Sequence, residues 1–231
     1  MRRVLVTGAS RGLGLEFVRQ YLAAGDQVTA ACRQPGTAAA LRGLSPDAAD
    51  RLSVIQLDVT DPASVSRAAT EHAQGELDLL INCAGVMGRH NDALGTIDYG
   101  EWLQVLNVNL LGPARMCEAF LPRLVQASHP VVVSITSGMG SLADNSSGGY
   151  IAYRTSKAAL NMLMRSAAID LKSRGVTCVL VNPGWVKTDM GGPGATLTAT
   201  QSVASMRRLI AKLGPQDSGR FFNYDGLEYP W

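Results

Sequence analysis

The sequence predicts an α/β fold in which a parallel, doubly wound sheet carries helices on both faces. Short runs of β-branched and aliphatic residues alternate with longer segments of helical periodicity along the chain. The short runs contain few polar residues, which is typical of parallel strands buried on both faces. Such alternation forms βαβ units with right-handed crossovers. At 231 residues the chain is expected to form a single domain, residues 1–231.

Each element follows from its local pattern. The expected strands are Val4–Thr7, Gln27–Cys32, Ser53–Leu57, Leu77–Asn82, Val131–Thr136 and Thr177–Asn182. The expected helices are Gly12–Ala24, Pro62–Gln74, Tyr99–Val125 and Tyr153–Ser173. Leu13, Phe17 and Tyr21 show helical spacing in the first helix. Pro62 behind Asp61 fits the first helical position after a capping residue.

Composition and charge exclude several classes of protein. Hydrophobic residues make up 46% of the chain and charged residues 17%, as in ordinary globular proteins. Twenty-one basic and 19 acidic residues give a net charge of +2, too small to indicate nucleic acid or an anionic membrane as partner. No apolar run approaches the roughly 18 residues of a membrane span or has the form of a signal peptide. We therefore expect a cytoplasmic protein.

Metal binding is not expected. The four cysteines stand far apart among apolar neighbours, which favours buried free thiols: Cys32, Cys83, Cys117 and Cys178. The three histidines are scattered through polar stretches: His72, His90 and His129. A zinc site needs clustered ligands.

Two glycine-rich segments interrupt the regular pattern. "SGMGSLADNSSGG" occupies residues 137–149, and "GWVKTDMGGPGATLT" occupies residues 184–198. Each follows an expected strand directly, so each emerges at the carboxyl edge of the sheet, where open α/β folds bind ligands.

A glycine turn after the first strand indicates a dinucleotide. "TGASRGLG" places Gly8, Gly12 and Gly14 between that strand and the helix that follows. Glycines let the backbone approach a ligand closely, and helix N-terminal amides attract phosphate. The spacing GxxxGxG departs from the common GxGxxG, and a turn that is merely glycine-rich is the alternative.

Arginines near this turn favour NADP(H) over NAD(H). The second strand ends at Arg33 rather than at the acidic residue that usually binds the ribose 2′-hydroxyl, and Arg11 lies inside the glycine turn. Guanidinium groups provide paired donors for a 2′-phosphate, whereas two solvated surface arginines are the alternative. Asp58 ends the third strand, where it either meets the adenine or stabilises a turn.

Tyr153 and Lys157 are the candidate acid–base pair. Residues four apart lie on one face of a helix, so this pair is either a surface contact or a phenol beside a positive charge that lowers its pKa. Tyr150 is the competing tyrosine, but it lies roughly 10 Å from Lys157 along the helix axis.

Six motifs along the sequence resemble those of the short-chain dehydrogenases/reductases. The matching motifs occur in family order: "TGASRGLG", "NCAG" (82–85), Asn109 in "NVNLLG", Ser137 in "VSITSGMG", "YRTSK" (153–157) and "NPGWVKT" (182–188). The ending "GRFFNYDGLEYPW" is similar to the branch of C-factor and the sniffer-like carbonyl reductases. The resemblance implies a Rossmann-like domain with a seven-stranded sheet, the last strand near Arg220–Asn223, and NAD(P)-dependent reduction of a carbonyl.

The resemblance also implies the roles of individual residues. The catalytic set is Asn109, Ser137, Tyr153 and Lys157. The cofactor-binding set is Gly8, Ser10, Arg11, Gly12, Leu13, Gly14, Arg33, Asp58, Val59, Asn82, Ala84, Gly85, Tyr153, Lys157, Pro183, Gly184, Val186 and Thr188. The substrate pocket is expected to include Met139, Tyr150, Trp185 and Met190, with Leu142 beside them. The loop at 184–198 carries glycines and a proline at 191–194 that fit a movable lid.

Three points depart from the family pattern or stay open. Cys83 stands where the family usually has a second asparagine. The interval from Ser137 to Tyr153 is longer than the family's common spacing, so Ser141 remains a rival for Ser137. By resemblance Asn109 anchors a water relay, and the alternative is a polar residue that kinks a helix and bonds to local backbone.

The expected reaction is hydride transfer to a ketone, aldehyde or quinone. Tyr153 would donate the proton, Lys157 and the oxidised nicotinamide would lower its pKa, and Ser137 would orient the substrate oxygen. Two alternatives remain: a dinucleotide-binding signalling protein of the C-factor type, and an epimerase or dehydratase on the same fold. The family commonly pairs through the helices near Tyr99 and Tyr153, so a homodimer or homotetramer is expected.

Overall fold

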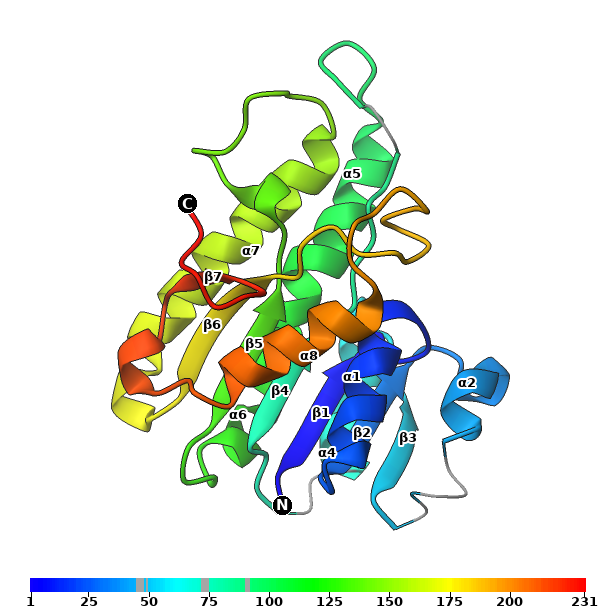
Figure 1. Ribbon diagram of the computed structural model, residues 1–231, viewed down its shortest axis with the longest axis vertical. Coiled ribbons are helices and arrows are strands. Elements are labelled where there is room, and N and C mark those ends of the chain that lie inside the picture. The colour runs from blue at the N-terminus through cyan, green and yellow to red at the C-terminus, as the bar shows by residue number, and fades with distance from the viewer. Residues whose placement is uncertain (45–47, 49, 72–74, 90–91) are drawn as a thin grey trace.

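A computed structural model describes residues 1–44, 48, 50–71, 75–89 and 92–231. Within them, seven strands form one parallel sheet in the order β3-β2-β1-β4-β5-β6-β7 (Figure 1). The strands are β1 Arg3–Thr7, β2 Gln27–Cys32, β3 Leu52–Gln56, β4 Leu79–Asn82, β5 Val131–Ile135, β6 Thr177–Asn182 and β7 Phe221–Asn223. The doubly wound, seven-stranded, Rossmann-like fold is therefore confirmed, and the strand order reverses between β1 and β4.

The helices include the four expected segments, with three differences: a π-helical interruption and two helices that were not expected, Ala39–Arg42 and Ala199–Ile210. The α-helices are α1 Gly12–Ala23, α2 Ala39–Arg42, α4 Pro62–Glu71, α5 Tyr99–Leu106, α6 Gly112–Leu124, α7 Ile151–Asp170 and α8 Ala199–Ile210. Short 3₁₀ turns are η1 Pro35–Thr37, η3 Gly138–Gly140, η4 Lys172–Arg174 and η5 Pro215–Asp217. The segment expected as one helix from Tyr99 is interrupted by a π-helical turn, η2 Asn107–Leu111.

Helix α8 was not expected, although its first residues carry a clear signal. The Thr198 hydroxyl accepts from the Gln201 amide, and the Gln201 side chain accepts from the Thr198 amide, which forms a capping box. The expected end of the second helix at Gln74, together with His72 and His90, lies outside the described residues.

Two apolar layers cover the sheet because successive strand residues point to opposite faces. Val4 and Val6 join one core with residues of α1 and α8, including Phe17 and Met206. Leu5 joins the other core, which includes residues of α4, α6 and α7 such as Val65, Phe120 and Met164. Figure 1 shows α1 and α8 in front of the sheet in this view. Both glycine-rich segments lie beyond the carboxyl ends of their strands, as expected.

The loop at 184–198 is paired with itself at its base. Val186 and Leu197 form a β-bridge, the Lys187 amide donates to the Leu197 carbonyl (2.8 Å), and the Leu197 amide donates to the Trp185 carbonyl (3.0 Å). These contacts hold both ends of the loop, so any lid movement is confined to residues between them. Its mobility stays a prediction.

Candidate active site and cofactor cleft

The glycine turn brings β1 into contact with the end of β4. Gly8 adopts a φ of +66°, and a Cβ there would lie 2.8 Å from the Ala84 Cα. A Cβ on Gly14 would overlap the carbonyl oxygen of Gly8. The Thr7 hydroxyl accepts from the amides of Cys83 (3.0 Å) and Ala84 (3.1 Å), which fixes the two strand ends together. The backbone is therefore open at the N-terminus of α1, as a phosphate group requires.

Most of the predicted cofactor residues line one cleft at this edge. Those that line it are Gly8, Ser10, Arg11, Gly12, Leu13, Gly14, Arg33, Asp58, Val59, Ala84, Gly85, Tyr153, Lys157, Pro183 and Thr188. Sequence reasoning missed further lining residues: Cys32, Leu57, Thr60, Cys83, Val86, Val108, Ile135, Thr136 and Asp189. Most of the missed residues are immediate sequence neighbours of predicted ones. Their position at the ends of strands is the signal from which they could have been predicted.

Three predicted cofactor residues lie outside the cleft lining. Asn82 is 3% exposed, and its amide group donates to the Ser134 hydroxyl (3.2 Å). Gly184 faces Leu197 and Tyr224, which a Cβ would meet at 2.7 and 2.9 Å. Val186 is buried in its bridge with Leu197. These residues shape the edge of the sheet and the base of the loop, and cofactor contact by them stays a prediction.

Arg33 and Arg11 both line the cleft, but Arg11 already has an ionic partner. Its guanidinium lies 2.8 Å from the carboxylate of Asp189, and both side chains are about three-quarters exposed, at 76% and 77%. Asp58 lines the cleft and also stabilises a turn, because its Oδ1 accepts from the amide and the hydroxyl of Thr60. The two roles considered for Asp58 are thus compatible.

Tyr153 and Lys157 lie on one face of the first turns of α7. Tyr153 is 6% exposed and Lys157 is 4% exposed, and both line the cleft. The Lys157 Nζ lies 5.8 Å from the centre of the Tyr153 ring and donates to the Ile135 carbonyl (2.9 Å). The pair is therefore a buried constellation at the cleft and not a surface contact.

The pKa of Tyr153 differs from the sequence expectation. Burial raises it to about 12, and only the hydrogen bond with Ser137 opposes this rise. Burial also lowers the pKa of Lys157 to about 8, against the opposing influence of Cys83. Burial thus outweighs any lowering of the Tyr153 pKa in the structure, and the lowering by Lys157 together with a bound nicotinamide stays a prediction. Tyr153 is therefore a protonated phenol at neutral pH, the state that a proton donor needs.

The structure separates Ser137 from its rival Ser141. An interaction with the Ser137 side chain lowers the pKa of Tyr153, and the Ser137 hydroxyl accepts from the Met139 amide (3.1 Å). Ser141 is 2% exposed, and its hydroxyl donates to the Trp231 carbonyl (3.0 Å) and accepts from the Asp144 amide (3.0 Å). The geometry favours Ser137 as the residue that orients a substrate oxygen.

Asn109 lies fully buried in the π-helical turn η2. Its side chain accepts from the Val86 amide (2.9 Å) and donates to the Val86 carbonyl (2.8 Å) and the Ser156 hydroxyl (3.0 Å). Asn109 does lie in an irregular helical turn, but its partners are the backbone of Val86, 23 residues away, and the side chain of Ser156, so the alternative of bonding to local backbone is wrong. These bonds clamp the cleft-lining Val86 beside α7, while a water relay stays a prediction.

Helix α7 begins from an unusual conformation and takes its cap from a distant residue. Tyr150 is in the left-handed region, with a φ of 50° and a ψ of 41°. The carboxylate of Asp92 accepts from the Ala152 amide (2.8 Å), and Asp92 is 8% exposed. Asp92 was not predicted, because sixty residues separate it from the helix that it caps.

The predicted substrate residues surround the opening only in part. Met190 lines the cleft, and its sulfur lies 4.0 Å from the Tyr153 hydroxyl. Trp185 is 57% exposed, and its indole donates to the Gly191 carbonyl (2.8 Å), so it braces its own loop. Leu142 is 81% exposed, whereas Met139 and Tyr150 are half-buried beside Ser137 and the start of α7.

Comparisons with known proteins agree with this geometry. The family of short chain dehydrogenases matches residues 2–196. C-signal of Myxococcus xanthus is 52% identical over 163 residues, covering 71% of this chain and 98% of its own length. The NADPH-bound carbonyl reductase from chicken fatty liver superposes with a TM-score of 0.93 at 36% identity, over 100% of this chain and 99% of that one. The carbonyl reductase Sniffer of D. melanogaster gives 0.96 at 30% identity, over 100% of both chains.

The chain belongs to the short-chain dehydrogenase/reductase family, and it is an oxidoreductase of the C-factor and sniffer type.

Two further findings concern metal ions and membranes. Within the described ranges, no three His, Cys, Asp or Glu side chains are arranged to hold a metal ion. The same part of the chain contains no helix that is long and apolar enough to cross a membrane.

Proposed function

We propose that this protein is an NADPH-dependent reductase that converts a ketone, aldehyde or quinone to an alcohol. The observation that carries the proposal is the buried pair Tyr153 and Lys157, which opens into the cleft behind the glycine turn, together with the half-buried Ser137, whose side chain acts on Tyr153. For a ketone or aldehyde, one carbonyl, one NADPH and one proton give one alcohol and one NADP⁺.

The residues present fit an NADP(H) molecule. Gly8 and Gly14 leave a cradle that a Cβ would fill, and the N-terminus of α1 opens toward it. Arg33 at the rim suits a 2′-phosphate, and Arg11 suits it once released from Asp189. The chicken carbonyl reductase, similar over the whole chain, was solved with NADPH. When bound, the cofactor supplies the hydride.

The chain's own residues manage the substrate oxygen and its proton. Ser137 donates a hydrogen bond to the carbonyl oxygen and orients it, as a donor aimed at developing negative charge. Tyr153, protonated at neutral pH, gives its proton to that oxygen. Lys157, with a pKa of about 8, is mainly charged at pH 7 and stabilises the phenolate that remains. Met190 gives the mouth of the cleft an apolar wall.

The test measures NADPH oxidation with a panel of hydrophobic ketones, aldehydes and quinones. Tyr153→Phe removes the proton donor while it keeps the ring, so kcat is expected to fall by roughly 10²–10⁴-fold. Tyr21→Phe is the matched control, because it removes a phenol that is as buried (3% exposed) but lies outside the cleft lining, and it should stay within a few-fold of the wild type. Full turnover by Tyr153→Phe on a substrate that the wild type reduces would show that the acid is assigned incorrectly.

A second candidate is a signalling role in which dinucleotide binding matters more than turnover. The 52% identity to C-signal over 163 residues favours it. A cellular phenotype that survives Tyr153→Phe but disappears in a glycine-turn variant would support this candidate. Loss of the phenotype in both variants would favour the reductase.

We also propose that the protein forms a homodimer or homotetramer through α5 and α7. Large apolar side chains are exposed on these helices: Tyr99, Leu103, Met162 and Ile169. Charged substitutions at Leu103 and Met162 should then yield monomers in sedimentation at micromolar concentration. A wild-type protein that sediments only as a monomer would reject the proposal. A cytoplasmic location stays a prediction.

A further inference from the structure

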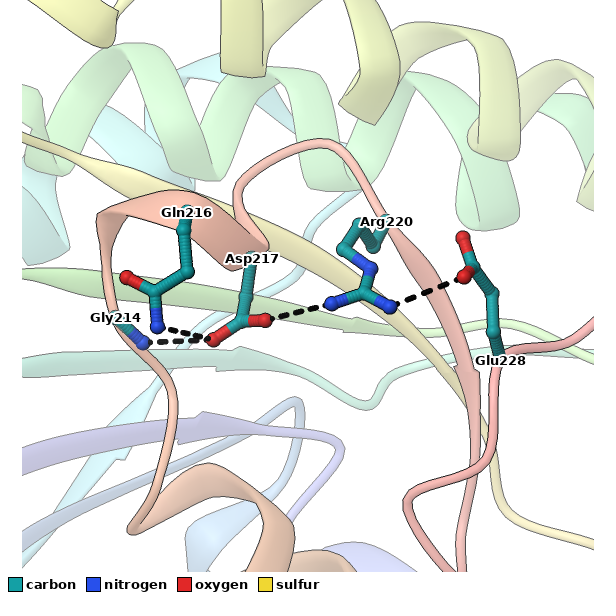
Figure 2. Close-up of polar contacts among 5 residues, drawn as sticks. All are labelled: Gly214, Gln216, Asp217, Arg220 and Glu228. Atoms are coloured by element: carbon teal, nitrogen blue, oxygen red, sulfur yellow. Dashed lines mark hydrogen bonds and ion pairs between the residues drawn. The ribbon is translucent and has the colours of Figure 1, made fainter.

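The residues that follow β7, 224–231, fold back along that strand; we call them the tail segment. The Tyr229 amide donates to the Phe221 carbonyl (2.8 Å), and the Asn223 amide donates to the Leu227 carbonyl (2.8 Å). Figure 2 shows Arg220 between the carboxylates of Asp217 (2.9 Å) and Glu228 (3.0 Å), which ties the tail segment to η5. The path of the tail segment is therefore fixed by β7.

This path brings the Tyr229 phenol behind the turn that carries Ser137. The Tyr229 ring packs on Phe221 with centroids 5.0 Å apart, and its hydroxyl donates to the Asp144 carboxylate (2.7 Å). Burial, and then Asp144, raise the pKa of Tyr229 to about 12, so the phenol remains a donor. A Cβ on Gly138 would lie only 2.5 Å from the Tyr229 hydroxyl oxygen. Tyr229 thus lies against the residue that follows Ser137.

The far end of the same segment is attached as well. The Trp231 carbonyl accepts from the Ser141 hydroxyl (3.0 Å) and from the Ala143 amide (2.8 Å). Further polar bonds hold the turn: the Met139 amide donates to the Ser137 hydroxyl and the Gly138 amide to the Asn182 side chain, each at 3.1 Å. The Gly140 amide donates to the Ser137 carbonyl and the Ser141 amide to the Gly138 carbonyl, each at 2.9 Å, and the Asn161 side chain donates to the Gly140 carbonyl (3.2 Å). Residues 138–144 therefore depend on the tail segment for one of their sides.

We propose that Tyr229 is a positioning residue that fixes the turn carrying Ser137 and, with it, the orientation of the Ser137 hydroxyl. The inference rests on the proposed reductase function and adds to it a residue that never touches the substrate. A displacement of about 1 Å at a positioned donor is enough to reduce turnover strongly. With glycine at 138, the phenol of Tyr229 supplies the contact that a side chain there would otherwise make.

The main variant is Tyr229→Phe, which removes the bond to Asp144 and keeps the ring on Phe221. We expect kcat to fall about 5–10-fold with NADPH affinity unchanged. Backbone amide exchange should quicken at Met139 and Gly140, whose amides bond to Ser137. Glu228→Gln is the matched control, one residue away from Tyr229. It breaks the ion pair between Arg220 and Glu228 shown in Figure 2 and should alter neither kcat nor amide exchange.

A double variant tests whether the effect passes through Gly138. Gly138→Ala forces a methyl group against the Tyr229 hydroxyl and should reduce kcat more than Tyr229→Phe does. Adding Tyr229→Phe removes the atom at 2.5 Å and leaves a ring carbon at 3.0 Å, so the double variant should recover part of the lost activity. The proposal would be contradicted if the relative kcat of the double variant equals or falls below the product of the relative kcat values of the two single variants.

The two proposals fail in different ways. If the wild type reduces no carbonyl in the panel, the reductase function fails, and amide exchange at Met139 and Gly140 alone decides whether Tyr229 fixes the Ser137 turn. If the wild type is active but Tyr229→Phe keeps its kcat and its exchange rates, only the positioning role is overturned.

Discussion

The two sides of the cleft are built in different ways. On the cofactor side, the glycine turn itself is local, because Gly8 and Gly14 belong to a single β–α turn, although Thr7 also joins this turn to the residues after β4. On the substrate side, the decisive contacts join distant segments: Asp92 to Ala152, and Asp144 to Tyr229. The comparison teaches that dinucleotide geometry is encoded locally, whereas the placement of Ser137 and Tyr153 depends on long-range contacts.

The largest expected effect breaks the cofactor side by one methyl group. Gly14→Ala would force a Cβ onto the Gly8 carbonyl, so the turn must open, at a cost of about 3 kcal/mol in stability. We also expect NADPH affinity to fall by about 100-fold or more, measured by fluorescence titration beside thermal unfolding. Gly36→Ala is the control, because a Cβ there meets nothing within 4 Å. Unchanged affinity in Gly14→Ala would contradict local encoding.

The second prediction concerns Lys157, at the junction of the two sides. Burial lowers its pKa from 10.5 to about 8. Since one pKa unit corresponds to roughly 1.4 kcal/mol, burying the charged lysine costs the folded protein about 3 kcal/mol of stability at pH 7. Lys157→Met loses the bond to Ile135, worth about 1 kcal/mol. The variant should therefore be about 2 kcal/mol more stable in denaturant unfolding at pH 7, while it loses activity.

The sign of the pH dependence follows from that depressed pKa. Below pH 8, Lys157 is charged in both the folded and the unfolded protein. The wild type then bears the full free-energy cost of burying the ammonium group. Between about pH 8 and 10.5 the unfolded state binds more protons than the folded state, and wild-type stability rises relative to the variant. The stability difference should shrink across that window. A constant difference would mean that the ammonium group is not the cause.

The third prediction compares two helix caps: one provided by a residue distant in sequence and one by the residue just before its helix. Asp92 caps α7 from a distance, and Asp98 caps α5 locally by accepting from the Glu101 amide (3.0 Å). Alanine at either position should cost about 1 kcal/mol, and thus a few degrees in Tm. Only Asp92→Ala should also lower kcat several-fold, because Tyr153 lies in the first turn of α7. Equal kcat values in the two variants would show that the distant cap does not position Tyr153.

The smallest expected effect lies where the two sides touch. Asp189→Asn frees Arg11 for the 2′-phosphate, so NADPH should bind about 2–3-fold more tightly while NADH binding stays the same. The change is small because both partners are exposed. Glu228→Gln alters the charge equally and breaks an exposed ion pair between residues outside the cleft lining. Equal gains for NADPH and NADH would remove the 2′-phosphate from the explanation.

The sequence placed residues at the cleft where a residue's neighbours along the chain decide its environment, while cofactor contact by those residues stays a prediction. The glycine turn, Arg33 and Asp58 all lie at strand ends, and every one of them lines the cleft. Asn82 and Gly184 have the same kind of position but face the sheet interior and Tyr224, because the pleat and the turn direct them away from the cleft. Sequence position therefore indicates the edge of the sheet but not the side that a residue faces.

The sequence by itself determined the alternating strands and helices, the glycine turn and the Tyr153–Lys157 spacing, because each depends on contacts within a few residues. Only the tertiary structure engaged the Ser141 hydroxyl with Trp231 and so favoured Ser137, provided Asp92 as the cap of α7, and placed Tyr229 against Gly138. Those outcomes depend on how segments separated by tens of residues pack together, and one-dimensional patterns carry no signal for such contacts.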